Sequence, residues 1–486
     1  MLRLAAILLA AALLLPAADD LNVNLKRVID AFSIIDENAA DAVAADQIFY
    51  QGAIPGLLHK LDPHSAFFDP GQFEQLRKME QSTQKGFGTV VSLVPGRVIV
   101  LQTVPGTPSA KAGLAAGDEI MAINGYVISR LDLEQLSELL TEARQHPAQL
   151  DVHRAGASGV TRMTLVPEDM ETPSVDRAFF IGPGLGYVRA ASFDERTGKD
   201  IRAAIEKLGG QHLAGLVLDL RNNPGGVVTA ALETASLFLK PGQTVFTIRG
   251  RNVPEKAEAV PEKVTPYTFK MVVLINEKSA SASEIVTGAL QDHDRATVIG
   301  NVSYGKGLVQ SVYPLSENAG LALTTALYYT PSGRSIQKPL ENGDFELAAT
   351  TAHPNKQQDF RTDSGRVVTG GGGIHPDFLV GPEPMNRLRM VLEASGSITQ
   401  FATDYLQSHK VDDDFEVTPQ ILDEFEAYAG GHGIQPSLSE WGQQMEFLRS
   451  RIKTEIFNQA FGVERGDQVD LQRDPLVLKA LQILGG

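Results

Sequence analysis

The 486-residue chain contains no cysteine, and its basic residues are outnumbered by its acidic ones. The missing thiol excludes disulfides, cysteine catalysis and cysteine-ligated metal sites, so stability must come from burial. The counts of 43 Lys and Arg and 59 Asp and Glu give a net charge of −16. Phosphate binding requires clustered cations, and this balance therefore argues against a nucleic-acid partner.

Long apolar runs are scarce as well, and the clearest one opens the chain in MLRLAAILLAAALLLPAAD. Arg3 precedes roughly a dozen apolar residues, a length typical of a secretory signal and short for a membrane span. Small residues and an acidic start follow Pro16. We therefore expect an exported, periplasmic or cell-envelope protein, with an uncleaved membrane-associated anchor as the alternative.

The remaining composition, 43% hydrophobic and 21% charged, is typical of a folded globular protein. The length suggests about three or four domains. Changes in the spacing of apolar residues give the boundaries. We expect a signal peptide at 1–18, a helical region at 19–82, a β-rich module at 83–168, an alternating strand and helix region at 172–382, and a helical accessory domain at 383–486.

The region 172–382 carries the pattern of an α/β fold. Apolar strands such as GLVLDL and MVVLIN alternate with helix-like segments such as GVVTAALETASLF. This alternation requires crossover connections and predicts a largely parallel sheet covered by helices.

The stretch NEKSASASEIVTGALQ, from Asn276 to Gln291, places three serines between a strand and a helix pattern. Ser281 and Glu284 fit the capping box, in which each side chain satisfies a backbone donor of the other residue. A helix N-terminus also directs free N–H groups and partial positive charge toward its neighbours. The pattern is therefore consistent with a plain helix cap and with a serine nucleophile beside an oxyanion site.

A nucleophilic serine needs a base. His293 is expected at the far end of the same helix, about 18 Å from Ser281 at 1.5 Å per residue. His64 lies in an Asp-Pro-His-Ser sequence, which forms turns for backbone reasons. The G-x-S-x-G pattern is absent around Ser281, so a Ser-His-Asp triad has no positive support.

Lys306 is the other candidate base, because glycines flank it in YGKGLVQ. Burial would lower its pKa and leave a neutral amine that can accept a proton. Period-two alternation in the following strand places Gln310 on the same face, where its amide could orient the amine. An exposed hairpin lysine is the alternative. A phosphate loop fits poorly, because Gly307 replaces the required Ser or Thr and a strand follows.

The module at 83–168 resembles a PDZ domain. The resemblance rests on GTPSAKAGLAAGDEIMAINGYVI at 106–128, preceded by Gly86, Phe87 and Gly88. In that family a glycine-containing loop binds the terminal carboxylate of a peptide, which pairs as an added strand. An unrelated small β-rich module is the alternative.

Three further segments, GLVLDLRNNPGGV, VVLINEKSASASEIVTGALQDHDRATVIGN and YGKGLVQS, together closely resemble the carboxyl-terminal processing peptidases, or tail-specific proteases. LDPHS at 61–65 and GGGGIHPD at 370–377 extend the resemblance to residues 45–382. It implies an α/β crotonase/ClpP-like serine protease core with an inserted PDZ domain, flanked by N- and C-terminal helical segments.

The resemblance also implies a site. Ser281 would be the nucleophile, Lys306 the base and Gln310 the supporting amide. Backbone N–H groups of Ala282 and of Gly225 or Gly226 would form the oxyanion hole. No metal, nucleotide or organic cofactor is required.

The implied function is an exported serine endopeptidase that binds protein or peptide substrates by their free C-termini and cleaves them through an acyl-enzyme. The alternative is an inactive PDZ scaffold that binds envelope protein C-termini. The sequence leaves open a homo-oligomer or an accessory adaptor.

Overall fold

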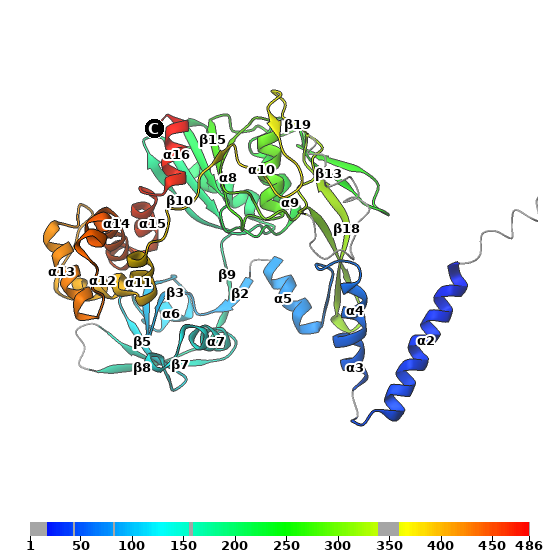
Figure 1. The fold of residues 1–486 in the computed structure, drawn as a ribbon, viewed down its shortest axis with the longest axis horizontal. Helices are drawn as coiled ribbons and strands as arrows, with labels where there is room; N and C mark the ends of the chain where they lie inside the picture. The colour runs from blue at the N-terminus through cyan, green and yellow to red at the C-terminus, as the bar shows by residue number, and fades with distance from the viewer. Residues whose placement is uncertain (1–16, 42–43, 81–82, 155–158, 339–358, 486) are drawn as a thin grey trace, which may run out of the picture. The chain divides into compact units, whose positions relative to one another are not determined.

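The computed structural model describes residues 17–41, 44–80, 83–154, 159–338 and 359–485, so most of the predicted signal peptide lies outside the described residues (Figure 1). The chain divides into two compact units. Unit 1 comprises Met1–Phe73 and Gln310–Thr324, and unit 2 comprises Glu74–Val309 and Thr325–Gly486. Within the described ranges, no helix combines the length and the apolar character that a membrane crossing requires.

The N-terminal part of unit 1 is largely helical, as predicted for residues 19–82, but the unit also contains β-structure. Its helices are α2 (Ala17–Asn38), α3 (Ala45–Ile48), the π-helix η1 (Phe49–Ala53) and α4 (Ile54–His59). Strand β1 (Ala66–Phe68) pairs antiparallel with β18 (Gly320–Tyr329), with Ala66 opposite Ala322. Helix α5 (Pro70–Glu80) leads out of the unit.

The module predicted to be a PDZ domain forms a β-sheet with two helices. The sheet order is β3-β4-β5-β7-β8, which leaves β3 at an edge, and β6 pairs with β5. Strands β2 and β9 pair antiparallel, so the chain enters and leaves the module at neighbouring points. The elements are β2 (Thr83–Gly86), β3 (Thr89–Val94), β4 (Arg97–Thr103), α6 (Pro108–Lys111), β5 (Glu119–Ile123), β6 (Tyr126–Val127), α7 (Leu133–Ala143), β7 (Ala148–His153), β8 (Val160–Leu165) and β9 (Glu168–Glu171).

The largest sheet of the region 172–382 has the order β10-β11-β12-β15-β16-β21. Its strands from β11 to β21 run parallel, and β10 is antiparallel to β11, which confirms the predicted α/β organisation. Helices α8, α9 and α10 lie in the crossover segments. The elements are β10 (Val175–Gly182), β11 (Leu185–Ala190), α8 (Thr197–Lys207), β12 (Gly215–Asp219), α9 (Val228–Ser236), β15 (Lys270–Ile275), α10 (Ala282–Asp292), β16 (Thr297–Gly300) and β21 (Phe378–Leu379).

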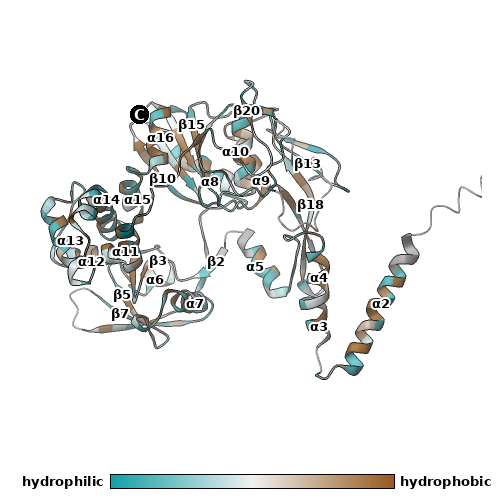
Figure 2. Cartoon of the chain, in the orientation of Figure 1, coloured by the Kyte–Doolittle hydropathy of each residue, from teal (hydrophilic) through white to brown (hydrophobic). Residues whose placement is uncertain are grey.

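The two faces of this sheet are covered by different helices. Alternate residues of β15 belong to two different apolar clusters. Val273 packs in the cluster formed with α8, α9 and α10, and Val272 packs in the cluster formed with α16 (Pro475–Leu484). Both side chains are fully buried. Figure 2 shows β15 largely in brown, as expected for a strand buried on both faces.

A second sheet includes the strand that follows Lys306 in sequence. Strand β13 (Thr244–Arg249) pairs with β14 (Lys256–Ala259) and with β18 (Gly320–Tyr329). Strand β17 (Leu308–Pro314) pairs with β18. The tip of this β17–β18 hairpin belongs to unit 1.

The predicted accessory domain at 383–486 requires a correction. Helices α11 (Arg387–Ser395), α12 (Ser397–Ser408), α13 (Pro419–Gly431), α14 (Leu438–Phe461) and α15 (Val463–Leu471) contribute to a core of their own. The last helix, α16, instead packs with the large sheet through Leu476, Val477, Ala480 and Leu484. It was predicted only as part of the helical region 383–486, and the sequence pattern could not reveal which core this helix joins.

Candidate active site

Ser281 occupies the turn between β15 and α10, as predicted. Its φ of 53° and ψ of −113° are unusual for a residue with a side chain. Such strain costs about 1–3 kcal/mol and is typical of functional sites. Ser281 and Glu284 take the predicted capping-box positions, with the Glu284 carboxylate accepting the Ser281 N–H, and every residue of α10 is buried. The turn therefore holds one partly buried serine hydroxyl at the amino end of a rigid helix.

The two neighbouring serines, Ser279 and Ser283, form structural hydrogen bonds. Ser279 and Ser283 are fully buried. The Ser279 hydroxyl donates to the Leu220 carbonyl oxygen at 2.7 Å, and the Ser283 hydroxyl donates to the Asn223 carbonyl oxygen at 3.0 Å. Both bonds tie the serine turn to the loop after β12, which leaves Ser281 as the serine of this turn that is open to chemistry.

Gly225, in the loop after β12, lies directly against the serine turn. Its φ is +95°, and a Cβ atom added to it would lie 2.8 Å from Ser281 Cβ and 2.9 Å from the Ala282 nitrogen. Both the conformation and the space therefore require glycine. The two loops predicted to form the site are in contact.

The fully buried Asn223 distinguishes between the two glycines predicted for the oxyanion hole. Its Oδ1 atom accepts the Gly225 N–H at 2.8 Å, so that donor is already in use. Among the described residues, no acceptor takes the N–H of Gly226 or of Ala282. Of the two glycines predicted for the oxyanion hole, the structure therefore favours Gly226 as the donor to accompany Ala282.

The Glu284 carboxylate joins the serine turn to the lysine loop. It is 1% exposed. Its Oε2 atom accepts the N–H groups of Ser281 and Lys306, each at 2.9 Å, and its Oε1 atom accepts the Gly305 N–H at 2.7 Å and the Ser303 hydroxyl. Ser281 and Lys306 therefore have their backbones fixed by one carboxylate oxygen.

Burial acts on both ionisable groups of this cluster. It raises the pKa of the Glu284 carboxyl, while the four donors lower it by a smaller amount. Burial also lowers the pKa of the Lys306 ammonium below its ordinary value of 10.5. The desolvated amine is therefore easier to deprotonate than an exposed lysine would be.

The glycines on either side of Lys306 are required by close packing. A Cβ atom added to Gly305, whose φ is +89°, would lie 2.8 Å from Lys338 Cβ. One added to Gly307 would lie 2.8 Å from the Gln337 nitrogen. Lys306 itself is partly buried, so the alternative of an exposed hairpin lysine does not fit the structure.

Gln310 lies on β17 within unit 1, and its side-chain amide donates to the His64 carbonyl oxygen at 2.7 Å. His64 belongs to a turn in which the buried Asp62 Oδ1 accepts the N–H groups of His64 and Ser65 at 2.8 and 2.7 Å. This confirms the turn predicted for LDPHS. An orienting role of Gln310 toward Lys306 stays a prediction.

His293 is confirmed at the far end of α10 from Ser281, where it is the C-cap residue. Its Nε2 atom lies 2.7 Å from the Thr244 carbonyl oxygen, and its Nδ1 atom lies 2.8 Å from Asp363 Oδ2. These bonds give His293 a structural role in joining α10 to its surroundings.

The glycine loop of the β-rich module is held in place through its carbonyl groups. The carbonyl oxygens of Phe87 and Gly88 accept the N–H groups of Ser109 and Val104 at 3.0 and 2.8 Å. Within the described ranges, the N–H groups of Phe87 and Gly88 donate to no backbone acceptor. Gly88 has a φ of +75°, and an added Cβ atom would collide with Thr107.

Comparison with known proteins assigns the family. The family model of Peptidase family S41 matches residues 184–347, and that of the PDZ domain matches residues 99–154. A carboxy-terminal-processing protease of Bartonella bacilliformis is 40% identical over 298 residues, which cover 60% of this chain and 68% of that protein. The chain belongs to the carboxy-terminal processing protease family. It is therefore a serine-type peptidase with a PDZ domain.

Other carboxy-terminal processing proteases match this chain over a similar length. A chloroplastic C-terminal processing peptidase of Tetradesmus obliquus is 35% identical over 312 residues, covering 61% of this chain and 67% of that protein. A carboxyl-terminal-processing protease of Synechocystis is 33% identical over 335 residues, which cover 66% of this chain and 77% of that protein. The predicted fold class, an α/β protease core with an inserted PDZ domain and helical segments, is confirmed.

For this carboxy-terminal processing protease, Glu284→Gln is expected to lower kcat/KM by about 100-fold, the cost of a misplacement near 1 Å at a reacting centre. Glutamine keeps the size but replaces one acceptor oxygen by an NH2 group. Either the Ser281 and Lys306 N–H groups or the Gly305 N–H group then faces a donor, and the serine turn and lysine loop are no longer held together. Steady-state hydrolysis of a denatured protein measures the effect.

Glu440→Gln is the matched control, because Glu440 occupies the same capping-box position in α14 and is remote in sequence from the site. Its turnover should equal that of wild type. If the Glu284 and Glu440 variants turn over equally fast, Glu284 has no role beyond capping.

Proposed function

We propose that this carboxy-terminal processing protease is an exported endopeptidase that cleaves protein substrates with a Ser281–Lys306 dyad through an acyl-enzyme. The observation that supports the dyad most directly is the shared bond of the two backbones to Glu284 Oε2. The oxyanion loop at Gly225 lies against the same serine. Export rests on the apolar run that follows Arg3.

In the proposed reaction, the neutral Lys306 amine removes the proton of the Ser281 hydroxyl as the oxygen attacks the scissile carbonyl carbon. The N–H groups of Ala282 and Gly226 stabilise the resulting oxyanion. The Lys306 ammonium then protonates the leaving amine, which departs and leaves an acyl-enzyme. Lys306 next removes a proton from a water molecule as its oxygen attacks the acyl carbon. The Lys306 ammonium then returns that proton to Ser281 Oγ as the acyl–oxygen bond breaks, which releases the product acid and restores the neutral amine. Gln310 is expected to orient the amine.

Two features of the core favour this chemistry. The lowered pKa of Lys306 increases the fraction of neutral amine at a given pH. The amino end of α10 adds partial positive charge beside Ser281, where the oxyanion develops. Because the amine must be unprotonated, activity is expected above the folded-state pKa of Lys306 and is lost as the pH falls through it.

Substrate selection is assigned to the PDZ domain. The N–H groups of Phe87 and Gly88 are suited to a terminal carboxylate, with Gly86 at the end of the adjoining strand. Strand β3 is at an edge of its sheet, where an extended tail can add as a further strand. The preferred substrates are therefore proteins or peptides with an accessible, free C-terminus.

A pair of otherwise identical peptides tests tail recognition, one with a free carboxylate and one amidated at the C-terminus. The amidated peptide is expected to show at least a tenfold lower kcat/KM, since charge-assisted hydrogen bonds contribute about 1.5–3 kcal/mol. The internal cleavage site should be the same in both. Equal kcat/KM values would refute recognition of the terminal carboxylate and leave the dyad assignment untouched.

A further inference from the structure

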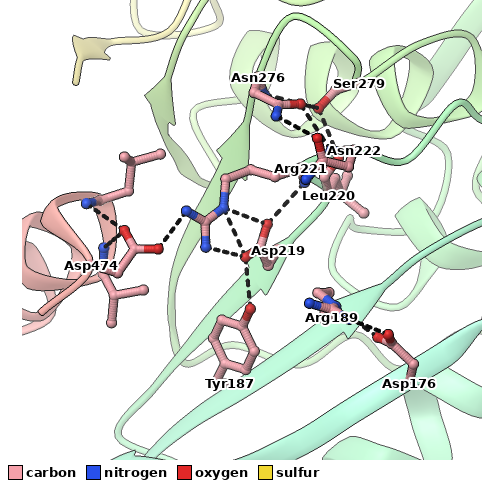
Figure 3. A network of polar contacts seen from close by, with 12 residues as sticks. Asp176, Tyr187, Arg189, Asp219, Leu220, Arg221, Asn222, Asn276, Ser279 and Asp474 are labelled. Carbon is pink, nitrogen blue, oxygen red and sulfur yellow. Dashed lines mark hydrogen bonds and ion pairs between the residues drawn. The ribbon is translucent and has the colours of Figure 1, made fainter. Parts of the chain in front are cut away.

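The side chain of Arg221 lies between two carboxylates at the carboxyl end of β12 (Figure 3). Its Nη2 atom donates to Asp219 Oδ2 at 2.6 Å, and its Nε atom contacts both oxygens of the same carboxylate at 2.9 and 3.0 Å. Its Nη1 atom donates to Asp474 Oδ2 at 2.6 Å. The guanidinium therefore joins the protease sheet to the start of the last helix.

The two oxygens of Asp474 have separate tasks. Oδ1 caps α16 by accepting the N–H groups of Leu476 and Val477 at 2.8 and 3.3 Å. Oδ2 accepts the Arg221 bond. An N-cap side chain needs one acceptor, so helix stability alone does not require the second oxygen or its charge.

Arg221 stands at the start of the loop that leads to the oxyanion glycines. Asp219 Oδ1 accepts its backbone N–H at 2.9 Å, and the Tyr187 hydroxyl donates to Asp219 Oδ2 at 2.7 Å. Residues Asn222 and Asn276 then exchange two bonds at 2.9 and 3.0 Å. The loop after β12 and the turn that carries Ser281 are thus held in one network, which Figure 3 shows.

Burial makes the second carboxylate important to Arg221. The side chains of Asp219, Arg221 and Asp474 are 1%, 19% and 16% exposed. Burial opposes the guanidinium charge, while Asp219 and Asp474 more than offset it and raise the pKa of Arg221. A cavity of about 430 Å³ is lined by these three residues and by Asn222, so water can replace a lost carboxylate and loosen the arginine.

We propose that Asp474 is a positioning residue for the proteolytic reaction. Through Arg221, its Oδ2 atom holds the loop from Asn222 to Gly226 so that the Gly226 N–H stays aligned with the Ala282 N–H. The inference rests on the proposed function. It assigns to the last helix a part in transition-state stabilisation in addition to its packing on the sheet.

The variant Asp474→Ser tests this role. Serine is an equally good N-cap but lacks the second, charged oxygen. We expect kcat to fall about tenfold, since poorly aligned oxyanion donors lose part of the stabilisation that full removal would cost. KM should stay within about twofold, because the bond that is lost involves no residue of the PDZ domain.

A second readout separates positioning from general stability. A peptide boronic acid, built on a peptide that wild type cleaves, forms a tetrahedral serine adduct with an oxygen in the oxyanion hole. Its affinity should fall by the same factor as kcat, while the thermal midpoint of Asp474→Ser falls no further than that of a variant that breaks another helix–sheet ion pair away from the oxyanion loop.

Asp467→Asn is the matched control. Asp467 on α15 pairs with Arg177 on β10, so it joins the preceding helix to the same sheet through a similar ion pair that does not include Arg221. Its kcat and boronate affinity should equal those of wild type.

The inference is overturned if Asp474→Ser keeps wild-type kcat and boronate affinity. Equal losses in both aspartate variants, accompanied by a lower thermal midpoint, would also overturn it in favour of general interface stability. A wild-type protein that forms no boronate adduct at Ser281 would instead refute the proposed function itself.

Discussion

The Ser281→Ala protein is expected to lose peptidase activity by about three orders of magnitude or more, since the acyl-enzyme cannot form without the nucleophile. The fold should survive, because the Glu284 bond to the Ser281 backbone does not involve the hydroxyl. The loss of a capping hydroxyl costs only about 1 kcal/mol. Hydrolysis of a denatured protein by the purified variant, followed by gel or mass spectrometry, measures the loss.

Ser437→Ala provides the control for this substitution. Ser437 is the N-cap of α14 and forms a capping box with Glu440, so the change removes the same kind of hydroxyl from a different helix. Its activity should match wild type. Equal turnover by wild type and Ser281→Ala would end the dyad assignment and favour the alternative of an inactive scaffold that binds protein tails.

The Lys306→Met protein is expected to lose activity to a similar extent. Methionine fills the space of the partly buried stem and removes the amine that accepts the serine proton. Because Ser281 and Lys306 act as one unit, the double variant should be no less active than either single variant. Folding should not suffer, since the charged amine is disfavoured by burial at this position.

Lys278→Met is the matched control for the lysine. Lys278 is exposed in the same turn as Ser281, so its removal changes the local charge without removing the proposed base. Wild-type turnover is expected. Substantial activity in Lys306→Met, or an equal loss in Lys278→Met, would mean that another group takes the serine proton.

The local parts of this architecture could be predicted from the sequence. The alternation of apolar strands and helices predicted the parallel sheet. A strand that is buried on both faces reads as a continuous apolar run, as from Met271 to Ile275. The spacing of Ser281 and Glu284 gave the start of α10. Glycines beside Lys306 indicated close backbone approach, which the structure confirms at Gly305 and Gly307.

The contacts between segments that are distant in sequence could not be predicted. Glu284 was expected to cap a helix, but its bonds to Gly305 and Lys306 depend on a loop about twenty residues away, and local spacing carries no information about them. The preference for Gly226 over Gly225 depends on the side chain of Asn223. No local pattern indicated that α16 would leave its neighbouring helices, or that Asp474 would bind Arg221.

The most direct test of the central claim is the titration of Lys306 itself in the folded Ser281→Ala protein. Competitive reductive methylation over a range of pH, read peptide by peptide with mass spectrometry, gives the pKa of each reactive lysine. The account predicts that Lys306 titrates below the ordinary lysine value of 10.5, because burial disfavours its charge. A Lys306 that titrates at or above that value would contradict the proposal that a neutral amine activates Ser281.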